Sequence, residues 1–252
     1  MAGEDARRVA LVTGATSGIG RATAERLHAD GWSVVATGQD DRRADEIAAV
    51  LRDRGHVARV DLAASDAATR LVAATVERFG RLDALVNNAG VHTLATAVET
   101  DDATWDRVLG INLRAAFQLA REAIPVMARG GGGTIVNVAS EAGLVAVPGQ
   151  VAYNVSKAGM VMLTRSLAID HADQGIRAVS VCPGTTETPL VREAIDAAPD
   201  PAAHARTLAA SRPAKRLGRV EEIAAAIAFT VGGEVGFLTG SELVIDGGYT
   251  AR

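Results

Sequence analysis

The octapeptide TGATSGIG at residues 13–20 joins a short apolar run at residues 9–12 to a segment with helical spacing at residues 21–30, which Gly31 is expected to end. Glycines let a chain turn sharply and bring backbone N–H groups close to an anion. A helix N-terminus adds a partial positive charge that suits a pyrophosphate. The octapeptide therefore predicts a strand–turn–helix unit that binds a dinucleotide; the alternative is a turn whose glycines serve packing alone.

The rest of the chain repeats this alternation of strand and helix. Buried parallel strands need not alternate in polarity, so short apolar or β-branched runs are expected as strands. The expected strands are residues 9–12, 33–37, 57–60, 82–86, 134–138, 177–181 and 242–245. Helical spacing places Ile47, Val50 and Leu51 on one helix face and predicts long helices at 103–127 and from Ala152 onward. The pattern predicts an α/β fold with a parallel sheet.

Residues 187–216 interrupt this rhythm, because they hold four of the seven prolines and are mostly polar and alanine-rich. Such a segment is typical of a loop that covers a site rather than of a core element. The glycine run at 130–133 is expected to be a flexible turn. Neither a linker nor an internal repeat is recognised, so residues 1–252 are expected to form one domain.

Composition excludes several classes of function. The chain has 252 residues, 48% of them hydrophobic, and a formal net charge of −4, which argues against disorder and gives no electrostatic footprint for nucleic acid. No apolar run is long enough to predict a membrane span. Cys182 is the single cysteine and residues 1–8 do not resemble a signal peptide, so we expect a reducing, cytoplasmic location. The scattered histidines predict no metal site, and a serine-hydrolase elbow is absent.

Tyr153 and Lys157 stand four residues apart in an expected helix, so their side chains share a face. A free tyrosine has a pKa of about 10, which is too high for proton transfer at neutral pH. Lys157 is expected to lower the pKa of Tyr153, and bringing it to about 7 takes roughly 4 kcal/mol. Tyr153 is therefore predicted to be a general acid–base. The alternative is a core tyrosine beside a solvated lysine.

Three motifs occur in order along the chain: TGATSGIG at 13–20, NNAG at 87–90 and YNVSK at 153–157. Together they resemble the short-chain dehydrogenase/reductase family, from about residue 8 to residue 248. The resemblance implies a single Rossmann-type, doubly wound domain with a seven-stranded parallel sheet flanked by helices. It also implies an NAD(P)-dependent oxidoreductase that interconverts a secondary alcohol and a ketone by hydride transfer. In such an enzyme a cationic oxidised nicotinamide and Lys157 together lower the pKa of Tyr153 to about 7, and Tyr153 is the general base in alcohol oxidation and the general acid in carbonyl reduction. A homotetramer is implied too, in which the apolar stretch 237–245 either forms subunit contacts or is buried within one subunit.

The resemblance implies two further catalytic residues beside Tyr153 and Lys157. Ser140, 13 residues before Tyr153, matches the serine that hydrogen-bonds the reacting oxygen and polarises the carbonyl; the alternative is a helix N-cap. Asn112 matches the asparagine that helps to hold a water-linked proton path to the lysine; the alternative is a structural helix kink.

The cofactor residues implied by the resemblance follow successive strands. Asp61 and Leu62 match an adenine contact, and Asn88 and Gly90 are expected to border the ribose and the nicotinamide. The loop at 183–188 matches the segment that meets the carboxamide. The full expected set is Gly14, Thr16, Ser17, Gly18, Ile19, Gly20, Gln39, Asp40, Asp61, Leu62, Asn88, Gly90, Tyr153, Lys157, Pro183, Gly184, Thr186 and Thr188.

The end of the second strand bears on the choice of dinucleotide. An acid there holds the ribose hydroxyls of NAD, whereas arginines favour the 2′-phosphate of NADP. In this chain Gly38 stands at the acid position, Gln39 follows it, and Ser17 replaces the basic residue that NADP-preferring members often carry in the glycine turn. A 2′-phosphate has no evident anchor, so NAD is favoured over NADP. Arg42 and Arg43 are the counter-argument, unless they are solvated at a helix start.

The substrate end is expected to include His92, Ser140, Glu141, Gln150 and Tyr153, together with Val147 and the segment 187–216. Glu141 directly follows Ser140 and is predicted to select a hydroxylated or basic substrate through hydrogen bonds, such as a polyol, a sugar or a cyclic secondary alcohol. The alternative is that Glu141 points to solvent.

Two other functions are compatible with parts of this pattern. A 3-oxoacyl-thioester reductase shares all the motifs, and a basic patch for an acidic carrier protein would support it; Arg206, Arg212, Lys215 and Arg216 are the candidates. A non-catalytic dinucleotide-sensing regulator would keep the fold, but such proteins usually lose a catalytic residue, and all four positions are filled here.

Overall fold

The computed structural model describes residues 7–251. Residues 1–6, part of the segment in which no signal peptide is expected, and Arg252 lie outside the described residues. Seven strands of the described chain form one sheet in the order β3-β2-β1-β4-β5-β6-β7, and all six pairings are parallel. The predicted doubly wound, seven-stranded parallel sheet is therefore confirmed. The strands are β1 (Val9–Val12), β2 (Ser33–Gly38), β3 (Gly55–Arg59), β4 (Ala84–Asn87), β5 (Gly133–Val138), β6 (Ile176–Pro183) and β7 (Glu242–Ile245).

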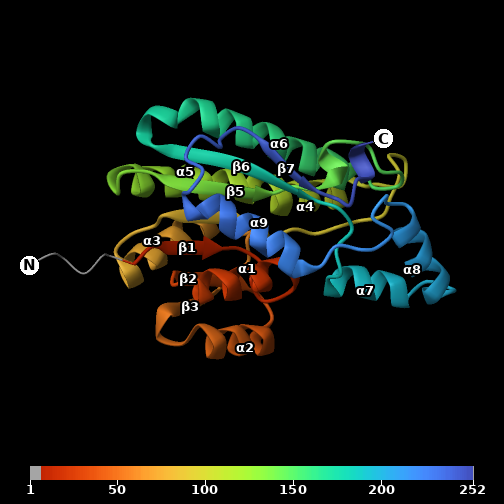
Figure 1. Ribbon diagram of the computed structural model, residues 1–252, viewed down its shortest axis with the longest axis horizontal. Coiled ribbons are helices and arrows are strands. Elements are labelled where there is room, and N and C mark those ends of the chain that lie inside the picture. Colours follow the sequence, from red (N-terminus) through yellow and green to blue (C-terminus); the bar gives the residue numbers. More distant parts are fainter. Residues whose placement is uncertain (1–6, 252) are drawn as a thin grey trace, which may run out of the picture.

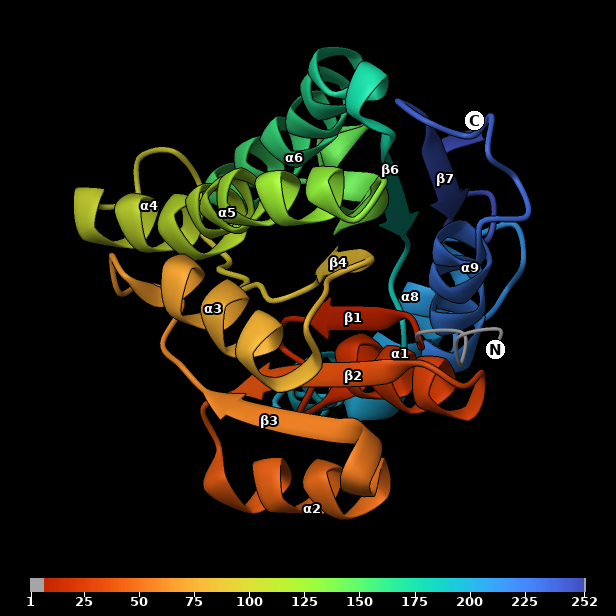
Figure 2. The same ribbon diagram turned by 90° about the vertical axis from the view of Figure 1, so that its left-hand side faces the viewer.

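Helices cover both faces of this sheet, as Figures 1 and 2 show. Helices α3, α5 and α6 pack on one face, and α1, α2 and α9 on the other. Helices α7 and α8 lie together beyond the end of β6. The α-helices are α1 (Gly18–Ala29), α2 (Asp41–Leu51), α3 (Ala67–Phe79), α4 (Asp102–Leu109), α5 (Ala115–Arg129), α6 (Val151–Asp170), α7 (Pro189–Asp196), α8 (Pro201–Ala210) and α9 (Val220–Gly232). Short helical turns are η1 (Arg52–Arg54), η2 (Gly110–Arg114), η3 (Glu141–Gly143), η4 (Ala172–Gln174) and η5 (Tyr249–Ala251).

Two sequence expectations need correction. The long helix expected at 103–127 is divided into α4 and α5 by η2, a single π-helical turn. A helical period describes the average spacing of apolar residues, so one inserted residue within a turn leaves little trace in it. Val50 is 39% exposed, whereas Ile47 and Leu51 are fully buried, so the buried face of α2 is narrower than expected.

Strand β1 contributes side chains to two hydrophobic cores, one on each face of the sheet. Leu11 contributes to the core beneath α3 and α5, whereas Ala10 and Val12 contribute to the core beneath α1 and α9. This division follows from the alternation of side chains across a strand. Because β1 pairs with β2 on one side and β4 on the other, the strand order reverses beside it. Ligands of open α/β sheets bind at this switch point, outside the carboxyl ends of the strands.

The turn after β1 has the conformation that the glycines predict. Gly14 has a φ of 62°, in the left-handed region that side chains rarely adopt. Helix α1 begins at Gly18, earlier than expected, and the N-cap residue Ser17 makes no side-chain capping bond. The first backbone N–H groups of α1 therefore remain available to an anion at the carboxyl edge of the sheet.

Residues 187–216 form α7 and α8 with connecting turns, and neither helix has a fully buried side chain. The segment is thus more regular than a loop, but it lies on the body without entering a core. Among the described helices, none combines the length and apolarity needed to cross a bilayer.

Candidate active site

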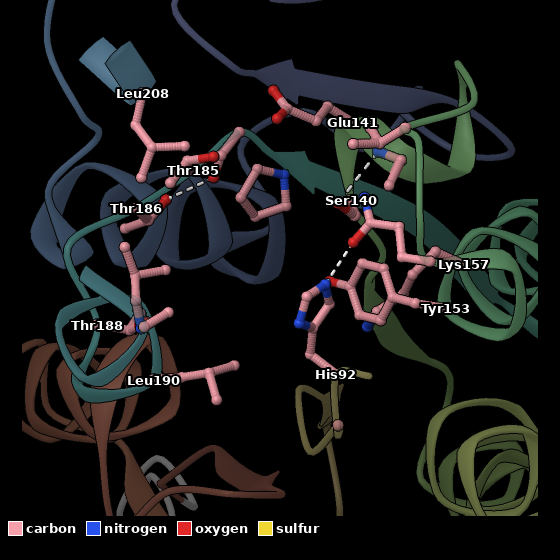
Figure 3. Close-up of a pocket in the computed structure, with 18 of the residues that line it drawn as sticks. His92, Ser140, Glu141, Tyr153, Lys157, Thr185, Thr186, Thr188, Leu190 and Leu208 are labelled. Atoms are coloured by element: carbon pink, nitrogen blue, oxygen red, sulfur yellow. Dashed lines mark hydrogen bonds between the residues drawn. The ribbon is translucent and has the colours of Figure 1, made fainter. Parts of the chain in front are cut away.

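A pocket of about 600 Å³ opens beside the ends of β4, β5 and β6, with α7 and α8 forming its outer wall. Figure 3 shows residues from distant parts of the chain facing this space. It brings together most of the residues expected to bind substrate or nicotinamide. Those that line it are Ile19, Asn88, Gly90, His92, Ser140, Glu141, Val147, Gln150, Tyr153, Lys157, Pro183, Gly184, Thr186 and Thr188.

Tyr153 and Lys157 share one face of α6, as their spacing predicts, and both line the pocket. Lys157 Nζ lies 5.6 Å from the centroid of the Tyr153 ring and donates a 2.8 Å hydrogen bond to the Val138 carbonyl. Burial lowers the pKa of Lys157 to about 8. The protein places the amine beside the phenol while holding it by the backbone of β5.

The electrostatics of Tyr153 differ from the expectation. Burial raises the pKa of its phenol, and a hydrogen bond with Ser140 is the effect that lowers it. The expected lowering of the Tyr153 pKa by Lys157 is therefore not supplied by the protein alone. A buried phenolate lacks the hydration that stabilises it in water, and the nearby charge of Glu141 raises the pKa further.

The structure supports the capping alternative for Ser140 and also places this residue in the pocket. Its hydroxyl accepts a 3.1 Å hydrogen bond from the Ala142 N–H, so it caps η3. Ser140 also lines the pocket and lies close enough to the Tyr153 phenol to lower its pKa. Capping fixes the orientation of the hydroxyl that a reacting oxygen would meet.

Asn112 lies within the π-helical turn and is completely buried. Its Oδ1 accepts from the Val91 N–H at 2.8 Å, while Nδ2 donates to the Val91 carbonyl at 2.9 Å and to Ser156 Oγ at 3.0 Å. A Cβ atom at Gly90 would lie 3.2 Å from Asn112 Oδ1 and 3.6 Å from Lys157 Nζ. Asn112 thus sits in an irregular turn, as the structural alternative holds, and it also lies near Lys157.

The residues expected at the adenosine end lie beside one another along β2 and β3. Gln39 Nε2 donates a 2.9 Å hydrogen bond to Asp61 Oδ1, and Asp40 caps α2 by accepting from the Arg43 N–H. Gly38 packs against Thr16, since a Cβ atom there would lie 2.2 Å from Thr16 Cγ2. Leu62 is buried in the core next to α3. Because neighbouring core residues cover most of the Leu62 side chain, little of it is left to make the predicted contact with adenine.

The backbone N–H donors at the start of α1 suit the phosphates of a dinucleotide. The N–H groups at the start of α1 lack a side-chain acceptor, and Asn88 Nδ2 braces the turn by donating to the Thr13 carbonyl at 2.9 Å. Ile19 brings the start of α1 into the same pocket as Tyr153. A chain of phosphates at α1 can thus continue to a ring beside Tyr153 and Lys157.

His92 and Gln150, both expected at the substrate end, are hydrogen-bonded to each other. The His92 ring meets the Tyr153 ring edge-on, with centroids 4.8 Å apart. Figure 3 shows His92 next to the Tyr153 phenol. The two side chains therefore border the place where a substrate oxygen would meet Tyr153.

Glu141 does not point to solvent, so that alternative is wrong. It is 6% exposed, and its carboxylate accepts a 2.5 Å hydrogen bond from Arg212 Nη2. Burial raises the pKa of Glu141 to about 7, although Arg212 lowers it. Of the four candidates for a basic patch, Arg212 is buried and Arg216 pairs with Glu222, whereas Arg206 and Lys215 are exposed.

The expected segment 187–216 contributes Leu190, His204, Leu208 and Arg212 to the pocket wall, although the sequence did not single these residues out for this role. Sequence reasoning missed Leu94 in the loop before α4, Thr185 in the loop after β6 and Tyr249 near the C-terminus, because no local pattern marks them. A buried glutamate requires a cationic partner, so Glu141 was the one available signal for Arg212. Within residues 7–251, no cluster of histidine, cysteine and acidic side chains is arranged to hold a metal ion.

Comparison with known proteins agrees with this site. A family model described as enoyl-(acyl carrier protein) reductase matches residues 14–250. An uncharacterized oxidoreductase of Thermotoga maritima is 42% identical over 97% of this chain and 98% of its own length. Cis-4-hydroxycyclohexanecarboxylate dehydrogenase of Sinomonas cyclohexanicum is 43% identical over 98% of both chains. 2-(R)-hydroxypropyl-CoM dehydrogenase of Xanthobacter autotrophicus is 39% identical over 97% of this chain and 99% of its own.

These relatives span nearly the whole chain, and the family match includes the glycine turn, the pocket and the residues around Tyr153. The sheet order and the Ser140, Tyr153 and Lys157 arrangement lead to the same assignment. The chain belongs to the short-chain dehydrogenase/reductase family of oxidoreductases.

Proposed function

We propose that this protein is an NAD-dependent dehydrogenase that interconverts a cyclic secondary alcohol and the corresponding ketone. The observation that carries the proposal is the convergence of Ser140, Tyr153 and Lys157 in a single pocket that also reaches the start of α1. We further propose that the chain acts as one dinucleotide-binding catalytic domain, with residues 187–216 closing over the substrate.

In this proposal each side chain has a defined task. A nicotinamide dinucleotide held at the start of α1 and beside Tyr153 and Lys157 would supply the acceptor for the hydride that leaves the alcohol carbon. Ser140 hydrogen-bonds the reacting oxygen, and Tyr153 takes its proton in oxidation or donates one in reduction. Lys157 stands beside the phenol, and Asn112 holds the backbone of Val91 next to that lysine. Asn112 is therefore proposed to support the proton path without contacting substrate.

A cyclic substrate fits the wall of the pocket better than a polyol or a sugar. The wall beyond Tyr153 is built largely from apolar side chains, namely Leu94, Val147, Pro148, Leu190, Val191 and Leu208. A polyol has hydroxyl groups that need hydrogen-bond partners once they leave water. The Glu141 carboxylate, which was expected to serve them, is engaged by Arg212. The relative from Sinomonas is named for a hydroxylated cyclohexane ring, which is in keeping with this choice.

A panel of alcohols tests the substrate class. We expect cyclopentanol and cyclohexanol derivatives to give kcat/KM values at least about tenfold above those of linear polyols, which corresponds to roughly 1.4 kcal/mol of transition-state binding. The formation of reduced nicotinamide, followed by absorbance, is the measurement. Preferred turnover of a polyol would contradict the proposed class while leaving the reaction type intact.

NAD is proposed as the physiological cofactor. Gln39 is paired with Asp61, and Arg42 forms an ion pair with Glu46, so both side chains near the ribose site have partners other than a phosphate. We expect a lower KM for NAD than for NADP in steady-state assays. Replacing Gln39 by arginine is expected to reduce the NADP KM by about tenfold, because a charge-assisted bond to phosphate becomes available. A lower KM for NADP in the unmodified protein would reverse the choice.

An acyl-thioester reductase is the second candidate, because the matching family model is described as an enoyl-(acyl carrier protein) reductase. A basic surface patch would favour this candidate, but Arg212, one of its four possible members, is buried. A reduction assay with a 3-oxoacyl thioester separates this candidate from the first. The dinucleotide-sensing regulator is less compatible with the filled catalytic positions.

We also propose a homotetramer in the cytoplasm. The segment 237–245 carries Phe237, whose side chain is fully exposed, and Val244, which is 44% exposed, so burial within one subunit does not account for the whole stretch. An exposed aromatic ring and an exposed strand residue within the same short stretch favour a contact between subunits. Light scattering of the purified protein measures the mass of the assembly directly.

A further inference from the structure

Glu141 and Arg212 form an ion pair that no step of the proposed reaction uses. Their side chains are 8% and 4% exposed, and the carboxylate and guanidinium are 2.5 Å apart. Transferring two charges out of water is costly, and the attraction between them offsets that cost only when further hydrogen bonds satisfy both groups. The contacts around this pair are therefore informative about its role.

Arg212 uses both ends of its guanidinium to hold separate segments. Nη2 donates to Glu141 and to Thr185 Oγ1, while Nη1 donates to the Leu208 carbonyl at 2.9 Å and to Ser211 Oγ at 2.8 Å. Its guanidinium carbon lies 5.1 Å from the centre of the Tyr249 ring. One side chain thus connects the end of α8, the loop after β6, the loop after β5 and the C-terminal turn.

Glu141 completes the connection from the other side. It is the neighbour of Ser140 in the chain, and in Figure 3 its carboxylate extends toward Thr185. The Thr185 backbone lies close enough to this carboxylate to lower its pKa. A Cβ atom at Gly184 would lie only 2.7 Å from Glu141 Oε2, so the carboxylate packs directly on the backbone of the loop after β6.

We propose that Arg212 is a positioning residue which, through Glu141 and Thr185, ties the end of lid helix α8 to the Ser140 loop and to the loop expected to meet the nicotinamide. The proposal rests on the proposed dinucleotide site. As a consequence, the ion pair fixes the positions of α8, Ser140 and the loop at 183–188 relative to one another. Loss of the pair weakens the binding of dinucleotide and substrate more than it slows the chemical step.

The test compares Arg212→Met, Arg212→Lys and the double variant Glu141→Gln with Arg212→Met, using Arg206→Met on the exposed side of α8 as the matched control. The Kd for NAD is measured by calorimetry, and kcat and KM are measured with the best alcohol of the panel. Amide hydrogen exchange of residues 201–216 is followed with and without NAD.

We expect Arg212→Met to raise the NAD Kd and the alcohol KM at least about tenfold, with kcat changed by less than about threefold. NAD protects residues 201–216 from exchange in the control but not in this variant. The double variant recovers part of the affinity, since it leaves no uncompensated buried carboxylate. Arg212→Lys keeps the charge but loses the planar fork, and it shows an intermediate Kd. Arg206→Met behaves as the unmodified protein.

The pH dependence gives a further readout. The groups that face the Glu141 carboxylate are Arg212, Asp246 and Tyr153. As the pH falls through about 7, Glu141 takes up a proton and the ion pair is lost. The NAD Kd of the unmodified protein therefore rises toward acid pH, whereas Glu141→Gln removes this inflection.

A purely structural role predicts a different result. It lowers the folded fraction, so that kcat per total protein falls while KM and Kd stay constant. That result in Arg212→Met, or in Arg212→Lys if the first variant does not fold, overturns the proposal. If the unmodified protein binds neither NAD nor NADP, the proposed function itself fails. If the unmodified protein binds NAD and the variants bind it with the same Kd, only the role proposed for Arg212 fails.

Discussion

Replacement of Tyr153 by phenylalanine is expected to lower kcat by about a thousandfold, because general acid–base catalysis contributes on this scale. The variant keeps the ring that meets His92 edge-on and loses only the phenol oxygen. Dinucleotide affinity is expected to change by less than about threefold, since the ring and Lys157 still line the pocket. The measurement pairs steady-state turnover with calorimetric binding of NAD.

The comparison of turnover with binding is what makes this test specific. Ser140 and Lys157 remain in place in the variant, and the backbone contacts of α6 are unchanged. A folded variant that binds NAD but no longer turns over is the expected outcome. If kcat stays within about tenfold of the unmodified protein, Tyr153 does not move the proton.

Replacement of Gly20 by alanine is expected to produce the second large effect. A Cβ atom at this position would lie 2.3 Å from the Gly14 carbonyl oxygen and 2.4 Å from Asn88 Nδ2. The start of α1 must then move away from the turn, and with it the N–H groups proposed to hold the pyrophosphate. Overpacking costs roughly 1–3 kcal/mol, so the NAD Kd is expected to rise about 10- to 100-fold.

Gly232→Ala in α9 is the matched control, because a Cβ atom there meets no other atom within 4 Å. It is expected to keep the NAD Kd and the melting temperature, whereas Gly20→Ala also melts at a lower temperature. An unchanged Kd in folded Gly20→Ala would mean that the start of α1 does not hold the phosphates.

Most of the fold was predictable, because its signals are local. Val9 to Val12 form a strand as the apolar run predicts, and the glycine turn leads directly into α1. Tyr153 and Lys157 share a face of α6 because any α-helix, whatever it packs against, places residues four apart on the same face. Ser140 follows β5 at the expected place. The π-helical turn around Asn112 was not predictable, because its stability depends on the bonds of Asn112 to Val91 and Ser156, which are remote in sequence.

The sequence alone determined the class of fold, and it predicted the glycine turn and the side chains proposed to be catalytic, since each depends on spacing within one element or on a short motif. The wall of the pocket and the state of Glu141 were decided only by tertiary structure. Arg212 is 71 residues from its partner, and burial of both side chains depends on how α8 closes against the loops after β5 and β6. The burial and the pairing of Glu141 and Arg212 result from that packing, so they cannot be predicted from the order of residue types along the chain.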